Sequence, residues 1–154
     1  MSQYASFRLG EHLFGIDLLR IREIDRIVDL TPVPGARDHV RGLINLRGQI
    51  VTVLDLGVRL GLPRRELGPT SHAIILKTRA DLAAQGGLDS AGAASDPAGF
   101  LVDAIGDVAE AGPAAIEPPS ANVGEAEARF LSGVVRTDAG LMVLLDLPAV
   151  LAGD

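Results

Sequence analysis

Residues 41–56 read RGLINLRGQIVTVLDL, two aliphatic runs on either side of the short connection Arg47-Gly48. Short runs rich in Val, Ile and Leu, bounded by Gly or Asp, are typical of buried β-strands. Glycine adopts the positive φ that tight connections need, so Gly42 and Gly48 are assigned structural roles. Asp55 follows the second run, where its carboxylate can accept N–H bonds from the next turn. The stretch therefore predicts a buried hairpin with a carboxylate cap at its end.

The same pattern recurs 91 residues later without a gap, as Gly133-Val134-Val135 followed by the aliphatic run 141–147. Both copies end in Leu-Asp-Leu, so Gly133 corresponds to Gly42, and Asp146 corresponds to the cap Asp55. Further upstream, residues 14–17 (FGID) echo residues 100–103 (FLVD). The repeat predicts two pseudo-equivalent subdomains, each with a buried hairpin.

The rest of the chain shows similar short aliphatic runs separated by turn residues. We expect strands at 4–9, 12–17, 25–29, 41–46, 49–55, 72–78, 99–104, 107–110, 132–137 and 141–146. Residues 17–24 and 56–62 are predicted to be short helical turns, and Pro63 ends the second. Many short strands of this kind favour an all-β fold.

Two polar stretches interrupt the pattern. Residues 80–98 contain mostly Ala, Gly, Ser and Asp, and such a stretch buries too little surface to offset its ordering entropy. We interpret it as a flexible hairpin loop between neighbouring strands. Residues 111–129 form a second polar connection, which Pro118-Pro119 holds extended.

The length and net charge of the chain limit the number of domains it can form and the partners it can bind. A chain of 154 residues fits one domain, or two small subdomains that share a core. Its net charge of -6 argues against nucleic acid or anionic lipid as partners, because such binding depends on clustered Lys and Arg. The N-terminal residues lack a charged segment followed by an apolar one, and no apolar run approaches ~18 residues. We therefore expect an unexported protein without direct membrane insertion.

The sequence gives little evidence of an enzyme active site. The three histidines lie far apart in the sequence, Lys77 follows no Gly-rich loop, and there is no Gly-x-Ser-x-Gly motif or cysteine. We predict no catalytic residue, no metal site and no cofactor. Two alternatives stay open at this point, a peptide-binding barrel and a small hydrolase or transferase with a noncontiguous site.

At these residues the chain resembles the CheW-like family, the coupling proteins of bacterial chemotaxis. Residues 40–56 (VRGLINLRGQIVTVLDL) are similar to the best-known stretch of that family, and residues 13–24 (LFGIDLLRIREI) to the segment before it. Residues 100–110 (FLVDAIGDVAE) and 130–147 (FLSGVVRTDAGLMVLLDL) match more loosely, so that the resemblance runs from about residue 4 to 151.

The resemblance implies two pseudo-symmetric SH3-like five-stranded β-barrels that share a hydrophobic core, with one or two short helices. Residues 1–154 would form a single CheW-like domain. The first barrel would consist mainly of residues 17–65 and the second mainly of 70–150, with an N-terminal strand packed on the second. The resemblance also implies a cytoplasmic scaffold without an active site, recruited to membrane receptor clusters through its partners.

The implied partners are the cytoplasmic signalling tip of methyl-accepting receptors, bound between the barrels, and the regulatory domain of a CheA-type histidine kinase. The residues that would face the receptor are Leu18, Ile21, Glu23, Asn45 and Arg47. Glu23 and Arg47 match positions that form an ion pair in the family, and such a pair would orient an interface. Two features depart from the family pattern: the 80–98 segment is long, and the 116–122 connection lacks basic and aromatic residues. The resemblance therefore does not imply that the chain assembles into ring-type arrays.

Overall fold

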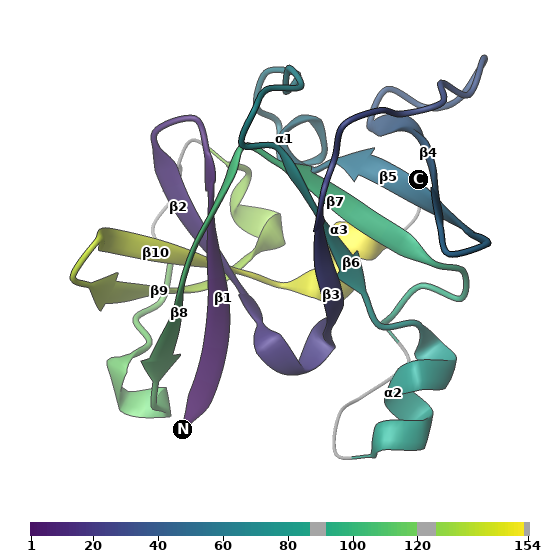
Figure 1. The fold of residues 1–154 in the computed structure, drawn as a ribbon. Coiled ribbons are helices and arrows are strands. Elements are labelled where there is room, and N and C mark those ends of the chain that lie inside the picture. The colour runs from purple at the N-terminus through teal and green to yellow at the C-terminus, as the bar shows by residue number, and fades with distance from the viewer. Residues whose placement is uncertain (87–91, 120–125, 153–154) are drawn as a thin grey trace.

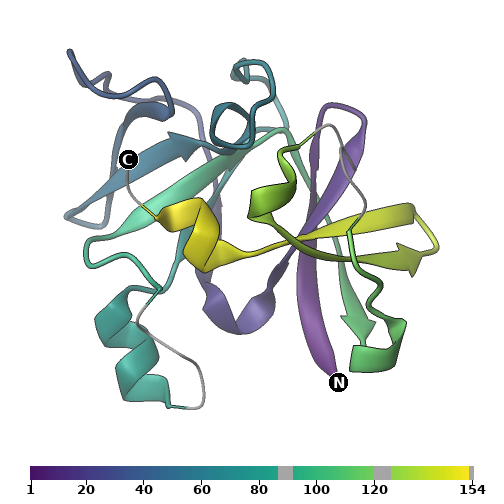
Figure 2. The same cartoon turned by 180° about the vertical axis from the view of Figure 1, so that it is seen from behind.

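A computed structural model describes residues 1–86, 92–119 and 126–152 of the chain. These residues form strands and short helices that build two sheets side by side (Figures 1 and 2). The strands are β1 (Ser2–Leu9), β2 (His12–Asp17), β3 (Ile21–Arg26), β4 (Val40–Leu46), β5 (Gln49–Asp55), β6 (His72–Leu76), β7 (Ala98–Val102), β8 (Ala104–Ala111), β9 (Leu131–Thr137) and β10 (Gly140–Leu145). The helices are α1 (Leu56–Arg59), α2 (Arg79–Gln85) and α3 (Leu147–Leu151), with 3₁₀ turns η1 (Leu18–Arg20), η2 (Pro113–Ala115) and η4 (Ala128–Phe130). The predicted all-β class is confirmed.

Sheet A has the strand order β8-β1-β2-β10-β9, and sheet B has the order β3-β6-β7-β5-β4. The sequence repeat matches β2 to β7, β4 to β9 and β5 to β10. When β1 and β3 are matched in chain order to β6 and β8, the correspondence converts one strand order into the other. Each sheet thus takes two strands from one copy of the repeat and three from the other. The parallel pairs β2·β10 and β5·β7 join the copies within each sheet.

This exchange distributes strands of both copies over the two sheets. The strands β6 and β7, assigned from the sequence to the second barrel, pair with β3 and β5 in sheet B. The physical reason is that the chain crosses from one sheet to the other after β2 and again after β7. The N-terminal strands β1 and β2 lie with β8, β9 and β10 in sheet A.

Among the described strands, neither sheet closes into a continuous hydrogen-bonded barrel. One antiparallel bridge instead joins the segment after β3 to β4, at Thr31 and Leu43, and an equivalent bridge joins Glu117 to Val134 on β9. A glycine precedes the β-strand member of each bridge. A Cβ on Gly42 would lie 2.6 Å from the Thr31 carbonyl oxygen, and a Cβ on Gly133 would lie 2.5 Å from Ile116 Cγ2. The paired glycines of the repeat therefore permit the close approach that covers each sheet edge.

The core follows the two-residue alternation of the strands. Within β6, Ile74 faces a core shared by both sheets, whereas Ile75 faces a smaller cluster that belongs to sheet B alone. Met142 and Val143 alternate in the same way in β10. The shared core contains Phe7, Phe14, Ile74, Phe100, Phe130 and Val143, among others. The expected shared core is confirmed.

The predicted caps Asp55 and Asp146 occupy equivalent positions at the starts of α1 and α3. Asp146 Oδ1 accepts the Ala149 N–H at 3.2 Å, and Asp55 Oδ1 accepts the Val58 N–H at 3.2 Å. Asp55 is fully buried, and its Oδ2 also accepts the Arg65 N–H at 2.8 Å. It therefore fixes the loop after α1 in addition to capping the helix.

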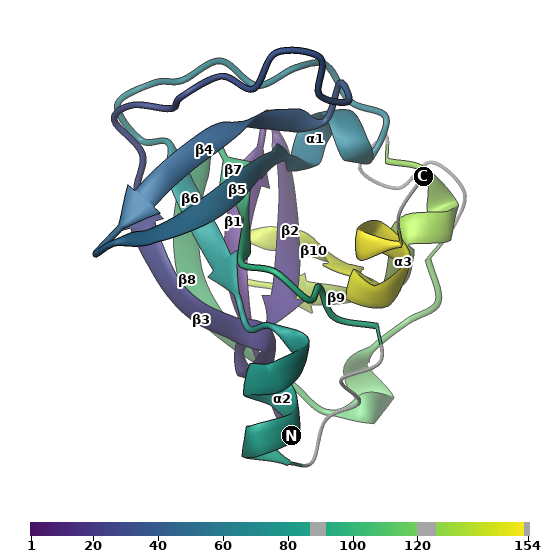
Figure 3. The ribbon, with the colours of Figure 1, turned by 90° about the vertical axis from the view of Figure 1, so that its right-hand side faces the viewer.

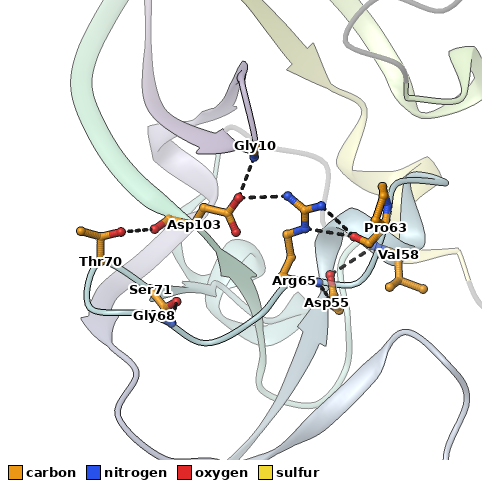
Figure 4. Close-up of polar contacts among 9 residues, drawn as sticks. All are labelled: Gly10, Asp55, Val58, Pro63, Arg65, Gly68, Thr70, Ser71 and Asp103. Carbon is orange, nitrogen blue, oxygen red and sulfur yellow. Dashed lines mark hydrogen bonds and ion pairs between the residues drawn. The ribbon is translucent and has the colours of Figure 1, made fainter.

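A network of polar contacts, here called the polar junction, connects the loop after α1 to sheet A (Figure 4). The Asp103 carboxylate, at the crossover between β7 and β8, accepts the Arg65 Nη1–H at 2.9 Å and the Gly10 N–H at 2.6 Å. Only 12% of the Arg65 side chain is exposed. Because Gly10 lies in the β1–β2 turn, the junction connects sheet A to the loop between α1 and β6.

Two predicted segments are wrong in part. Residues 17–24 were expected to be helical, but only Leu18–Arg20 form a 3₁₀ turn, and Ile21 begins β3 because pairing with β6 overrides the local pattern. The 80–98 segment was expected to be a loop, yet α2 begins there. Thr78 and Asp81 form a reciprocal capping box, and Leu82 is fully buried. Residues 87–91 of that segment, and 120–125 of the second connection, lie outside the described residues.

We expect Gly42→Ala to destabilise the fold by about 2 kcal/mol, because its φ of 156° disfavours a side chain and its Cβ would meet backbone rather than a flexible group. Gly68→Ala is the matched control, because a Cβ there meets nothing within 4 Å. Urea unfolding of both variants checks this prediction. Equal stability of the two would contradict the role assigned to Gly42.

Candidate functional site

The turn between β4 and β5 holds Arg47 in an unusual conformation. Arg47 has a φ of 52° and Gly48 a φ of 87°, as in a two-residue hairpin turn in which both central residues are left-handed. Such a conformation costs a non-glycine residue roughly 1 kcal/mol. Asn45 Oδ1 accepts the Gly48 N–H at 2.8 Å and so stabilises the turn. Asn45 and Gly48 have clear structural roles, whereas Arg47 occupies a position that suits its backbone poorly.

Arg47 forms an ion pair with Glu23 on β3. Its Nη2 lies 2.6 Å from Glu23 Oε1 and 2.5 Å from Oε2. β3 and β4 are the two edge strands of sheet B, so the ion pair links the two edges of this sheet. Figure 3 shows both strands on the left side of the molecule. The Arg47 side chain is 68% exposed and that of Glu23 is 24% exposed. An exposed pair of this kind contributes about 0–1 kcal/mol to stability.

Two carboxylates lie side by side on β3. Glu23 and Asp25 are opposite Ile75 and Ala73 of β6, and both of these belong to the cluster of sheet B. The hydrogen bond from Arg47 lowers the pKa of Glu23, and the nearby carboxylate of Glu23 raises the pKa of Asp25. Asp25 Oδ2 is buried and has no hydrogen-bond partner among the described residues. At neutral pH Glu23 is therefore ionised.

The two aliphatic side chains predicted to contact a receptor differ in how far they are exposed. Ile21 is 8% exposed and belongs to the shared core, so it supports β3 from beneath and offers almost no contact surface. Strand alternation turns Ile21 inward. Leu18 is half-buried against the same core, and its neighbour Leu19 is 54% exposed. Leu19 is thus the more accessible aliphatic side chain of η1.

A groove of about 360 Å³ lies next to Asn45, between residues 26–31 and β4. Val28, 85% exposed, and Leu43 line it. Ile50, opposite Asn45 on β5, is 56% exposed. Sequence reasoning missed Val28 because only the Thr31–Leu43 bridge brings its segment beside β4. We call Glu23, Arg47, Asn45 and this groove the sheet B site.

In the ranges 1–86, 92–119 and 126–152, no group of three or more His, Asp or Glu side chains is placed to hold a metal ion. No helix within the same ranges has the length and hydrophobicity needed to cross a membrane.

We expect Asp25→Asn to raise the melting temperature at pH 7. A carboxyl whose folded-state pKa is raised opposes folding once the pH exceeds its unfolded value, and the penalty is complete above the folded value. The amide removes that penalty. Thermal unfolding at pH 7 and pH 3 checks the sign, since the gain should disappear at pH 3, where the acid is protonated. A gain of equal size at both pH values would contradict the charge argument.

Comparison with known proteins identifies the family. Residues 3–154 match the CheW-like domain. The chain is 30% identical to the chemotaxis protein CheW of Thermotoga maritima, covering 95% of this chain and 85% of that protein. It is 29% identical to CheW of Rhizobium meliloti, covering 94% of this chain and 84% of the relative. The crystal structure of the scaffolding protein TtCheW from Thermoanaerobacter tengcongensis superposes with a TM-score of 0.75 at 29% identity, over 95% of this chain and 84% of that one. The chain belongs to the CheW-like domain family.

Proposed function

We propose that this chain is a non-enzymatic scaffold that couples methyl-accepting receptors to a CheA-type histidine kinase in a chemosensory pathway. Its similarity to chemotaxis proteins named CheW, and to a solved scaffolding protein, supports this role. The observation that carries the proposal is the placement of Arg47. A cation held in a left-handed turn, mostly exposed and paired across a sheet edge, contributes too little stability to explain its position.

The receptor signalling tip binds at the sheet B site. Arg47 and Glu23 supply opposite charges that fix the orientation of a partner, because charge complementarity sets specificity at an interface. The groove beside Asn45 supplies apolar surface through Val28 and Leu43, and Leu18 and Leu19 lie on the turn that leads into β3. Together these features form a small apolar patch with a charged rim, the usual composition of a protein interface.

The kinase regulatory domain binds a different surface, since a coupling protein must hold both partners at once. The chain is recruited to receptor clusters through these contacts and needs no membrane segment of its own for that purpose.

We expect Arg47→Glu to weaken binding to a receptor signalling tip at least tenfold, because it replaces complementary charge with repulsion of Glu23 and of the partner. Its melting temperature should stay close to that of the wild type, since the exposed ion pair contributes little to stability. Calorimetric titration and thermal unfolding measure the two effects.

Arg64→Glu is the matched control, with the same change in charge at an exposed position after α1. It should bind the receptor tip as the wild type does. Undiminished binding by Arg47→Glu, or an equal loss in the control, would refute the sheet B site.

A further inference from the structure

Two carboxylates of β3, those of Glu23 and Asp25, lie on the side of sheet B that encloses its own apolar cluster. Side chains two residues apart on a strand share a side of the sheet. The residues opposite them on β6, Ile75 and Ala73, belong to this cluster, and so does Ile27, two residues after Asp25. Carboxylates thus occupy two positions at which the strand pattern predicts apolar side chains.

The two carboxylates differ in their partners. Both oxygens of Glu23 are paired with Arg47 Nη2, at 2.6 and 2.5 Å. The Oδ2 atom of Asp25 is buried and has no hydrogen-bond partner among the described residues. An ionised oxygen in such a place has lost its water without receiving a donor, so the position favours the protonated acid. Protonated Asp25 can also donate a hydrogen bond to Glu23.

The surrounding charges place this proton on Asp25 and not on Glu23. Contact with Glu23 is the largest cause of the raised pKa of Asp25, followed by loss of hydration on burial, while Arg47 and Arg22 act in the opposite direction. The hydrogen bond from Arg47 is the largest cause of the lowered pKa of Glu23. The pair therefore holds one proton to a higher pH than an isolated aspartate does.

The other titratable groups on neighbouring elements are directed elsewhere. β6 presents Ala73 opposite Asp25, and Nδ1 of the adjacent His72 lies 2.8 Å from the Thr70 carbonyl oxygen. Arg26 Nη2–H donates to a backbone carbonyl oxygen of the α1–β6 loop at 2.9 Å, and Asp29 is exposed. The proton on Asp25 is therefore governed mainly by Glu23 and by the arginine that crosses from the β4–β5 turn.

This proton completes a series of contacts from the interior of sheet B to its surface. The Asp25 O–H donates to Glu23, and Glu23 accepts from the guanidinium of Arg47, whose side chain is 68% exposed. Once Asp25 is ionised, its charge repels the Glu23 carboxylate and competes with it for the same guanidinium. Arg47 then loses its single fixed partner, and a binding protein must order its side chain again.

We propose that Asp25 is a positioning residue of the sheet B site, which binds one proton, shares it with Glu23 and so fixes the Arg47 guanidinium for a receptor. Receptor affinity then falls as the pH rises and Asp25 loses its proton. By linkage, binding at a pH where Asp25 is ionised takes up a proton. This inference rests on the proposed coupling function and adds a regulation of the same site.

NMR of the free full-length chain tests the positioning step without any receptor. The carboxyl carbon resonance of Asp25 and the side-chain Nε–H resonance of Arg47 should titrate together over roughly pH 5 to 8. In Asp25→Asn the Arg47 resonance should stay at its low-pH position throughout, because the amide donates to Glu23 at every pH. An Arg47 resonance that does not follow Asp25, or that still titrates in the variant, overturns the proposal.

Calorimetric titration with a receptor signalling tip tests the consequence for binding. Wild-type affinity should fall at least about fivefold between pH 5 and pH 8, whereas the affinity of Asp25→Asn should change less than about twofold. Two buffers of different ionisation enthalpy should reveal proton uptake by the wild type and none by the variant. Asp25→Leu, which is neutral but cannot donate, should bind more weakly than Asp25→Asn at every pH. Equal affinities of the Leu and Asn variants would show that charge alone matters and would overturn the positioning role.

Two control variants separate Asp25 from other titrating groups. Asp38→Asn removes an exposed carboxylate from the segment between β3 and β4, and His72→Gln removes the histidine beside Ala73 on β6. Both should keep the wild-type pH dependence of receptor binding. Loss of that dependence in either control, or its survival in Asp25→Asn, overturns the role of Asp25 and leaves the coupling function intact. Undetectable receptor binding by the wild type at every pH, with Arg47 still following Asp25 in the free chain, instead refutes the coupling function.

Discussion

Each sheet of this chain contains strands from both copies of the internal repeat, and this exchange forces the two sheets to share one hydrophobic core. Phe14 of β2 and Phe100 of β7 are equivalent in the repeat and both are fully buried in that core. Neither copy could complete a sheet alone, because two of the strands it needs lie in the other copy. The molecule therefore folds as one unit, and the relative orientation of the sheets is fixed by packing.

Because the orientation is fixed, the molecule has two similar ends with different chemistry, one at the β4–β5 hairpin of sheet B and the other at the β9–β10 hairpin of sheet A. The same hairpin, glycine and aspartate cap recur at each end, so the scaffold is nearly equivalent, while the exposed turn residues are free to differ. One end carries a guanidinium paired with a carboxylate, and the other carries carboxylates around an open pocket. The partly buried Arg65–Asp103 junction between the two sheets adds rigidity. A scaffold that must hold two proteins in a defined geometry gains from both properties.

The features that could be predicted from the sequence are those with a local cause. Gly48 predicts a turn, and the carboxylates of Asp55 and Asp146 predict caps, through residue type and spacing. Gly42 and Gly133 were also expected at turns, but they lie within β4 and β9, where they permit the bridge contacts. The exchange of strands could not be predicted in this way, since short aliphatic runs do not specify their pairing partners. The burial of Ile21 depends on the pairing of β3 with β6, which local pattern does not reveal, and α2 was missed because its single buried Leu82 leaves little helical periodicity.

The central claim is that the Arg47 turn and the adjoining groove form the surface that meets a receptor. The most direct measurement is an NMR titration of the isotopically labelled full chain with a receptor signalling tip. The account predicts that amide shift changes concentrate in residues 18–28 and 43–50 and leave residues 104–110 and 136–142 unchanged. Changes centred on sheet A instead, with β3 and β4 unaffected, would contradict it.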